Sequence, residues 1–186
     1  MLLFGAGVLG GMMNAIAGGG SFITFPALIA AGVPPISANA TNTYASCAGY
    51  ISGALGFRHE LWAHRQLLPR IMLSSLFGGA LGAWLLIQTS PQAFAVAIPW
   101  LLLFATVLLV YGHRLQAALR DWFGHSARAS ALGMLAFSLA LLVISIYGGF
   151  FNAGLGIILL GFLTLAGYTD VHLMNGIKLL VSAVVA

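Results

Sequence analysis

The stretch GGMMNAIAGGGSF, residues 10–22, decides the fold, because it places five glycines and an asparagine inside a long apolar run. An apolar run of this length is typical of a membrane-spanning helix. Each glycine destabilises a helix by about 1 kcal/mol relative to alanine. Backbone at membrane depth leaves the helical pattern only where protein or a water-filled cavity satisfies its polar groups. The stretch therefore predicts a helix that is broken inside the membrane.

The composition of the whole chain predicts an all-α, polytopic helical membrane protein. Of the 186 residues, 61% are hydrophobic and 5% are charged, whereas charged residues make up about 25% of an ordinary soluble domain. So few charged side chains cannot cover a soluble surface. The formal net charge of +4 does not indicate nucleic-acid binding, because six of the seven Lys and Arg residues lie in segments 58–70 and 113–128 and form no aromatic–basic patch.

These two basic segments predict the orientation of the chain. Lys and Arg residues beside membrane spans are held in the cytoplasm by the positive-inside bias, so we expect 58–70 and 113–128 to be cytoplasmic loops. The link at 88–92 is uncharged and belongs on the other side. Cys47 is the single cysteine, so no intramolecular disulfide forms, and we expect no metal or other cofactor.

Apolar segments of about 20 residues, the length that spans a bilayer, recur along the chain. The segment 129–167 is too long for one span, because as a helix it would extend roughly 58 Å across a hydrocarbon core of about 30 Å. We expect a full helix at 129–147 and a broken element that begins at Gly148. The apolar segments are 2–32, 36–57, 67–88, 93–112, 129–167 and 171–186.

Small residues at four-residue spacing predict closely packed helices, because they let helix backbones approach one another in lipid. Such rows indicate a tight bundle and carry no chemistry of their own. The rows are Gly49 with Gly53, Ser74 with Gly78 and Gly82, and Ser75 with Gly79 and Ala83.

The opening motif recurs later in the chain. GGMMNA at 10–15 returns as GGFFNA at 148–153. Each copy is followed by further glycines, then by a glycine turn at Gly32 or Gly167, and then by a helix with polar residues. This shared order predicts an internal repeat.

The repeat predicts two units, a first transmembrane repeat at 1–125 and a second at 126–186 that is incomplete at its C-terminal end. Paired, glycine-interrupted helices at corresponding positions indicate the central site of a secondary transporter. A half-helix that begins at such a break points free N–H groups and its positive dipole end at the site, so the expected ligand is an anion. An anion channel would have the same breaks and is an alternative.

The candidate substrate-binding residues lie at the two breaks and on the polar helices that follow them. Lys178 either pairs with the anion or extends to the membrane interface. Asn14 and Asn152 either orient the anion or cap freed backbone groups, and the side chains at 39–42 either bind it or hydrogen-bond between helices. Ser21 is expected to cap the half-helix that follows it. The full set is Asn14, Gly18, Gly19, Gly20, Ser21, Asn39, Thr41, Asn42, Asn152, Gly154, Gly156, Asn175 and Lys178.

Catalysis is not expected. The apolar segments hold no Ser–His dyad, H-E-x-x-H motif or paired aspartates that would supply a nucleophile or a metal site. Asp170 and His172, beside the turn at Gly167, either carry coupled protons or lie in a solvated loop, and the loop is the favoured interpretation.

Two stretches resemble the sulfite exporter TauE/SafE family of bacterial inner-membrane permeases. They are GGMMNAIAGGGSFITFPALIAAGVPPISANATN (10–42) and YGGFFNAGLGIILLGFLTLAGYTDVHLMNGIK (147–178). The resemblance implies a multi-pass protein of the inner membrane that exports small sulfur-containing anions, such as sulfite or organosulfonates, with coupled protons or ions. Another small organic anion is an alternative substrate. Family members are usually longer, in agreement with an incomplete second repeat.

Overall fold

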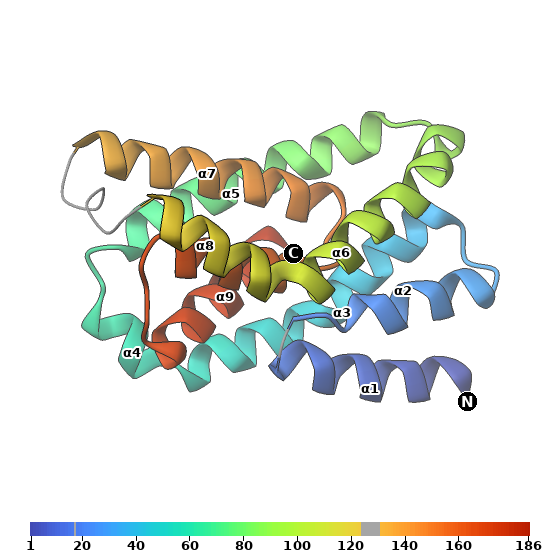
Figure 1. The fold of residues 1–186 in the computed structure, drawn as a ribbon. Helices are drawn as coiled ribbons and strands as arrows, with labels where there is room; N and C mark the ends of the chain where they lie inside the picture. Colours follow the sequence, from blue (N-terminus) through green and yellow to red (C-terminus); the bar gives the residue numbers. More distant parts are fainter. Residues whose placement is uncertain (17, 124–130) are drawn as a thin grey trace.

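The computed structural model describes residues 1–16, 18–123 and 131–186, and all regular secondary structure in these residues is α-helical (Figure 1). The expected all-α fold class is confirmed. In this part of the chain the helices are α1 (Leu2–Ile16), α2 (Ser21–Ala30), α3 (Pro35–Gly56), α4 (Arg58–Ala63), α5 (Leu68–Gln88), α6 (Pro91–Phe123), α7 (Ala131–Phe150), α8 (Leu155–Leu165) and α9 (Val171–Val185).

Two of the described helices have the length and composition of membrane spans. Among the described residues, Leu68–Gln88 and Gly133–Phe150 are each long and apolar enough to cross a membrane, with mean hydropathy of 1.6 and 2.0. The outward side of α5 is apolar and exposes Phe77, Leu81 and Trp84. A surface of this kind suits contact with lipid tails rather than with water.

Proline and glycine set several helix ends. Pro35 and Pro91 begin α3 and α6, where the N–H that proline lacks would have no helical partner. α2 and α8 end alike, because Gly32 at φ +84° and Gly167 at φ +78° both turn left-handed. In both turns the residue after the glycine donates its N–H to the carbonyl oxygen five residues back. The predicted glycine turns are confirmed.

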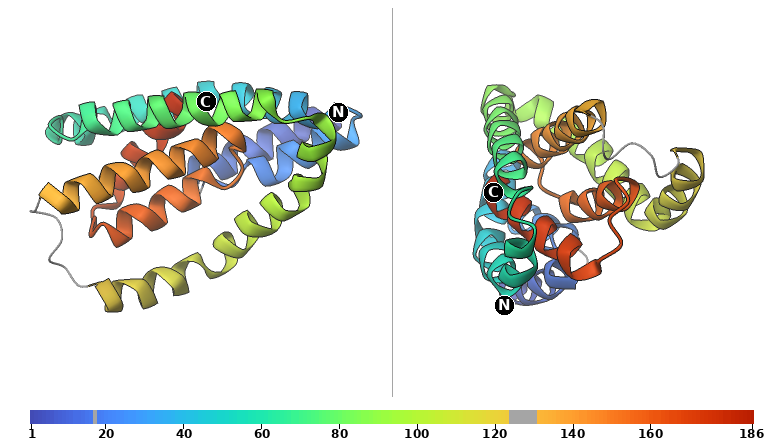
Figure 2. Two further views of the ribbon diagram at one scale, coloured as in Figure 1. Left: turned by 90° about the horizontal axis from the view of Figure 1, so that it is seen from above. Right: turned by 90° about the vertical axis from the view of Figure 1, so that its left-hand side faces the viewer.

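The segments that carry the two glycine motifs run in opposite directions. α1, α2 and α3 point the opposite way to α7, α8 and α9 respectively (Figure 1 and Figure 2). Both segments have the same order of elements: helix, break, short helix, glycine turn and polar helix. That they are copies of one unit stays a prediction, as do the boundaries 1–125 and 126–186.

The two basic segments lie at the same end of the molecule. α4 and the C-terminal end of α6 are both at that end in Figure 2. The prediction of loops at 58–70 and 113–128 is wrong in part. The first segment contains α4 and the start of α5. In the second, α6 continues to Phe123 through LQAALRDW, which is rich in strong helix formers. Positions 124–128 lie outside the described residues. The cytoplasmic location of both segments stays a prediction.

Small residues bring α5 and α7 into close contact, as their spacing predicted. A methyl group on Gly82 would collide with the carbonyl oxygen of Ile146, and one on Gly78 would lie 2.6 Å from the carbonyl oxygen of Leu142. The prediction for Gly49 is wrong, because no atom lies within 4 Å of the position that its side chain would take.

α7 continues through the glycine pair of the second motif. The break that we expected at Gly148 begins only after Phe150. Gly149 lies so close to the backbone of Gly79 that a methyl group would collide with it, and Gly148 packs against Leu155. This glycine pair therefore serves close helix packing and does not unwind the helix.

We expect Gly82→Ala to destabilise the protein by about 1–3 kcal/mol, because the methyl group overpacks the contact between α5 and α7. Gly49→Ala is the matched control, since it makes the same change inside a helix, gains similar helix propensity and meets open space. Thermal unfolding in detergent micelles measures both. Equal unfolding temperatures for the two variants would contradict the predicted overpacking.

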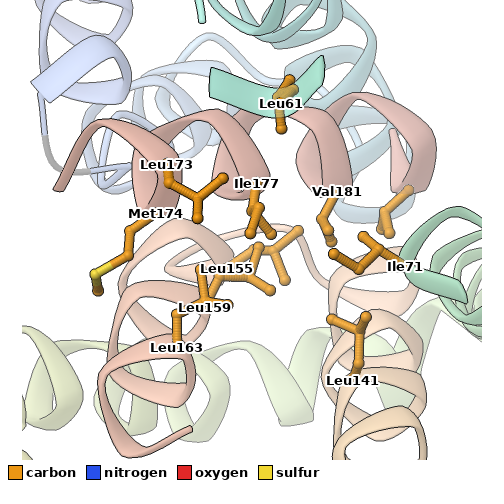
Figure 3. Close-up of a cluster of buried hydrophobic side chains, with 11 residues drawn as sticks. Leu61, Ile71, Leu141, Leu155, Leu159, Leu163, Leu173, Met174, Ile177 and Val181 are labelled. Carbon is orange, nitrogen blue, oxygen red and sulfur yellow. The ribbon is translucent and has the colours of Figure 1, made fainter. Parts of the chain in front are cut away.

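One hydrophobic cluster holds α8 and α9 against α4, α5 and α7 (Figure 3). Leu155, Leu159 and Leu163 form a row at four-residue spacing on α8, and Ile177 and Val181 of α9 belong to the same cluster. The cluster fixes the start of α8 relative to α9. These two helices carry Gly156, Asn175 and Lys178 of the candidate site.

Candidate functional site

The first glycine break lies between α1 and α2 and is held by Asn14. Gly18 adopts φ +84°, which glycine takes without strain, and residue 17 lies outside the described residues. The Asn14 side chain is 9% exposed. It accepts a hydrogen bond from the backbone N–H of Gly20 at 2.8 Å and donates one to the Ser46 hydroxyl at 3.3 Å. Both ends of this amide are therefore engaged.

Asparagines on α3 hold the helix ends at both breaks. Asn42 donates to the Ser21 hydroxyl at 2.9 Å and accepts a hydrogen bond from the Thr24 hydroxyl, both on α2. Asn39 donates to the carbonyl oxygen of Phe150, the last residue of α7, at 3.0 Å. In this structure the two side chains therefore hydrogen-bond between helices.

The expectation that Ser21 caps α2 is wrong. The cap position is Gly20, because α2 begins at Ser21 itself, and no side chain caps the helix. α8 likewise begins after Gly154 without a side-chain cap. The cap residue of each half-helix is therefore a glycine, which supplies no capping side chain, although at α2 the amide oxygen of Asn14 accepts a hydrogen bond from the N–H of Gly20.

The second break, between α7 and α8, is held by other groups. Gly154 adopts φ +79°, and the Tyr147 hydroxyl donates to the carbonyl oxygen of Ala153 at 2.7 Å. Asn152 is 2% exposed, and its Nδ2 and Oδ1 both lack a hydrogen-bond partner among the described residues. A buried polar group left unsatisfied in this way costs about 1–3 kcal/mol.

The two breaks meet at their glycines. A methyl group on Gly156 would lie 2.8 Å from the Cα of Gly18, and one on Gly154 would lie 2.9 Å from the Cβ of Ala105 on α6. Gly19 packs less tightly, against Met13 and Phe22. The Gly18–Gly156 approach is too close for any Cβ, and it brings the N-terminal ends of α2 and α8 together.

Lys178 is the buried cation of the site. It lies on α9, is 1% exposed and donates to Asn175 Oδ1 at 2.9 Å. Its aliphatic chain passes the second break, since a methyl group on Gly156 would lie 3.3 Å from its Cδ. The acidic side chains that the structure describes, Glu60 and Asp170, form no ion pair with it. A charge in a membrane segment costs at least ~2.5 kcal/mol, so this lysine marks a candidate functional site.

The exposure of Lys178 excludes the alternative in which it extends to the membrane interface, because the ammonium group does not reach an exposed surface. Its partner Asn175 is anchored in turn, donating to the carbonyl oxygen of Val171 at 3.0 Å. The lysine is thus oriented by its own helix.

Asp170 is placed as a helix cap. Its Oδ1 accepts hydrogen bonds from the backbone N–H groups of His172 at 2.9 Å and Leu173 at 3.3 Å. Both Asp170 and His172 are exposed, and the His172 ring lies beside Phe57 with a centroid distance of 6.1 Å. This geometry agrees with the favoured interpretation of a solvated loop.

A groove of about 550 Å³ lies between α1, α2 and α3. Three of the candidate residues line it, namely Asn14, Thr41 and Asn42, and Thr41 is exposed there. Asn152 and Lys178 are not among the lining residues. The thirteen candidates therefore do not share one cavity: the glycines and Lys178 gather where the breaks meet, and the amides of α3 lie beside them.

Sequence reasoning missed two residues that the structure places beside the breaks. Ser46 accepts the hydrogen bond from Asn14, and the Tyr50 hydroxyl lies beside both Ser46 and Asn152. Both residues line the groove. A signal was present, because Asn42, Ser46 and Tyr50 follow one another at four-residue spacing, which places polar groups on one face of an apolar helix.

Known proteins resemble this chain over most of its length. The sequence pattern of the family described as sulfite exporter TauE/SafE matches residues 3–186. The chain is 32% identical over 169 residues to the probable membrane transporter protein ORF9 of a Sinorhizobium species, an alignment that covers 89% of this chain and 61% of the relative. It is 31% identical over 169 residues to a probable membrane transporter protein of Haemophilus influenzae, with 90% and 63% covered.

A third relative is the probable membrane transporter protein YfcA of Escherichia coli, 31% identical over 171 residues, with 90% of this chain and 60% of the relative covered. The chain thus spans about three fifths of the length of these curated relatives. No solved structure matches it. Because the family pattern extends over nearly the whole chain, this membrane protein belongs to the sulfite exporter TauE/SafE family.

Proposed function

We propose that the protein is a secondary transporter of small sulfur-containing anions, such as sulfite or organosulfonates, and that the anion binds between the two glycine breaks. The observation that carries this proposal is Lys178, a cation that is 1% exposed and has no ion-pair partner among the described side chains. A counter-ion supplied by the substrate would offset the cost of burying this charge.

The half-helices add to the attraction for an anion. α2 and α8 both begin without a side-chain cap, and their starts are adjacent because Gly18 touches Gly156. Each helix start carries the equivalent of about +0.5 elementary charge. Two such ends beside one lysine create a positive region that favours an oxyanion over a neutral or cationic solute.

The opposed directions of the two segments give a route to alternating access. In transporters with inverted repeats, one unit rocks against the other around a fixed central site. Here the helices α1–α3 run in the opposite direction to α7–α9. The two segments touch at Gly18 and Gly156, where neither residue has a side chain that would separate the two backbones. We propose that protons or other ions couple to this movement.

Purified protein in proteoliposomes tests the function directly. We expect uptake of radiolabelled sulfite that saturates with concentration, is competed by organosulfonates, and depends on an imposed pH or ion gradient. Exchange of internal for external sulfite would be accelerated in a carrier. Uptake that is linear in concentration, shows no such exchange and follows only the membrane potential would instead indicate an anion channel. Failure to take up either sulfite or organosulfonates would contradict the substrate class.

A further inference from the structure

The two glycine breaks differ in how far their polar groups are already hydrogen-bonded. At the first break both amide atoms of Asn14 are engaged, and so are both amide atoms of Asn42. At the second break Asn152 is engaged at neither amide atom, although it is 2% exposed. Buried polar groups in proteins are nearly always satisfied, so this difference calls for a physical explanation.

The length of the connection accounts for the difference. Asn14 lies six residues before Gly20, the cap position of α2, whereas Asn152 lies only two residues before Gly154, the cap position of α8. In the shorter connection the backbone closes on itself, since the N–H of Leu155 donates to the carbonyl oxygen of Asn152 at 3.2 Å. This backbone hydrogen bond stabilises the second break, and the side-chain amide of Asn152 does not take part in it.

A hydroxyl donor lies beside this amide, and a lysine side chain passes Gly156, four residues further along the chain. The hydroxyl of Tyr50, a residue 4% exposed on α3, lies beside Asn152. The Lys178 side chain passes Gly156, and its ammonium group uses one of its three N–H donors on Asn175. An ammonium group, an amide N–H and a hydroxyl form a donor set that suits the oxygens of an anion.

We propose that the oxyanion binds at the second break only, where Lys178 Nζ, the amide of Asn152 and the hydroxyl of Tyr50 donate to it. Asn14 and Asn42 are then positioning residues, which shape the first break and do not touch the ligand. This inference rests on the proposed transport function and narrows it. The donor set requires at least two acceptor oxygens on a small anion, as sulfite and sulfonates have.

A matched pair of variants separates the two asparagines. Asn14→Ala removes two hydrogen bonds, so we expect a lower unfolding temperature in detergent together with a retained upward shift when sulfite is added. Asn152→Ala removes no hydrogen bond, so we expect an unchanged or higher unfolding temperature, loss of the sulfite-dependent shift and about a tenfold higher KM for sulfite uptake. Asn152→Asp, which keeps the shape and adds a negative charge at the second break, should also lose the shift.

The tyrosine is tested in the same assays. Tyr50→Phe deletes only the hydroxyl, and we expect KM to rise several-fold and the sulfite-dependent shift to shrink. Tyr44→Phe is the control, because Tyr44 lies on the same helix and is 83% exposed. Its KM should equal that of the unmutated protein. A sulfite-dependent shift that survives in Asn152→Ala and Asn152→Asp would overturn this inference and leave the proposed function intact.

A loss of the shift in folded Asn14→Ala equal to that in Asn152→Ala would also overturn it, because the site would then involve both breaks. By contrast, an unmutated protein that neither transports nor is stabilised by sulfite or an organosulfonate would overturn the proposed function, and this inference with it. The unmutated protein and the variants thus report separately on the two proposals.

Discussion

Lys178→Met is expected to reduce sulfite uptake into proteoliposomes by about 100-fold or to background, because it removes a charge-assisted hydrogen bond worth up to about 3 kcal/mol. Methionine has a similar volume and no charge. Since Lys178 is 1% exposed and has no ion-pair partner among the described side chains, its replacement relieves a desolvation cost. The variant should therefore unfold at the same temperature as the unmutated protein or at a higher one.

A loss of sulfite uptake without a fall in unfolding temperature distinguishes a ligand-binding lysine from a structural one. Arg70→Met is the control, because it removes one positive charge from an exposed position at the start of α5. We expect its uptake to stay within about twofold of the unmutated protein, since exposed charges are screened by salt. Full uptake by Lys178→Met would sink the assignment of the lysine, and a collapse in its unfolding temperature would show that the lysine is structural.

Gly18→Ala is expected to have the second-largest effect, because it separates the two breaks. An alanine at φ +84° costs about 1–2 kcal/mol in backbone strain. In addition, its Cβ would lie 2.7 Å from the Cα of Gly156, and overpacking of this kind costs typically about 1–3 kcal/mol. We expect a loss of about 2–5 kcal/mol in the free energy of unfolding and uptake below a tenth of that of the unmutated protein.

Gly32→Ala is the control that separates the effect of the Gly18–Gly156 contact from the effect of backbone strain. Gly32 has the same φ of +84°, yet no atom lies within 4 Å of the position of its side chain. It should therefore lose only the strain energy of about 1–2 kcal/mol and keep its uptake. Chemical denaturation and uptake assays on both variants measure the difference. Similar losses of stability and uptake in the two variants would mean that the Gly18–Gly156 contact has no special importance.

Features of the fold that depend on local chemistry were readable in the sequence. The apolar composition predicts membrane helices because a charge-poor chain cannot face water. Gly32 and Gly167 predict helix-ending turns because glycine alone takes a left-handed φ at no steric cost, and both turns are confirmed. The row of small residues in α5 predicts close packing against a neighbouring helix, and the structure shows that this neighbour is α7.

Glycines were ambiguous where two local explanations compete. Gly148 and Gly149 looked like the start of a break, and the structure uses them inside α7 to approach its neighbours. Gly49 looked like a packing residue, and it meets open space. Whether a glycine unwinds a helix or packs it depends on which helix lies opposite, and spacing along one chain does not contain that information.

The sequence by itself determined the all-α fold class, the glycine turns and the lysine that is the single charge deep in an apolar segment. Only the tertiary structure decided that α1–α3 and α7–α9 oppose each other, that Gly18 meets Gly156, and that Asn14 is hydrogen-bonded while Asn152 is not. The physical reason is the distance along the chain between the residues that interact. Helix ends and burial follow from neighbouring residues, whereas a hydrogen bond between helices depends on where distant segments place their donors and acceptors.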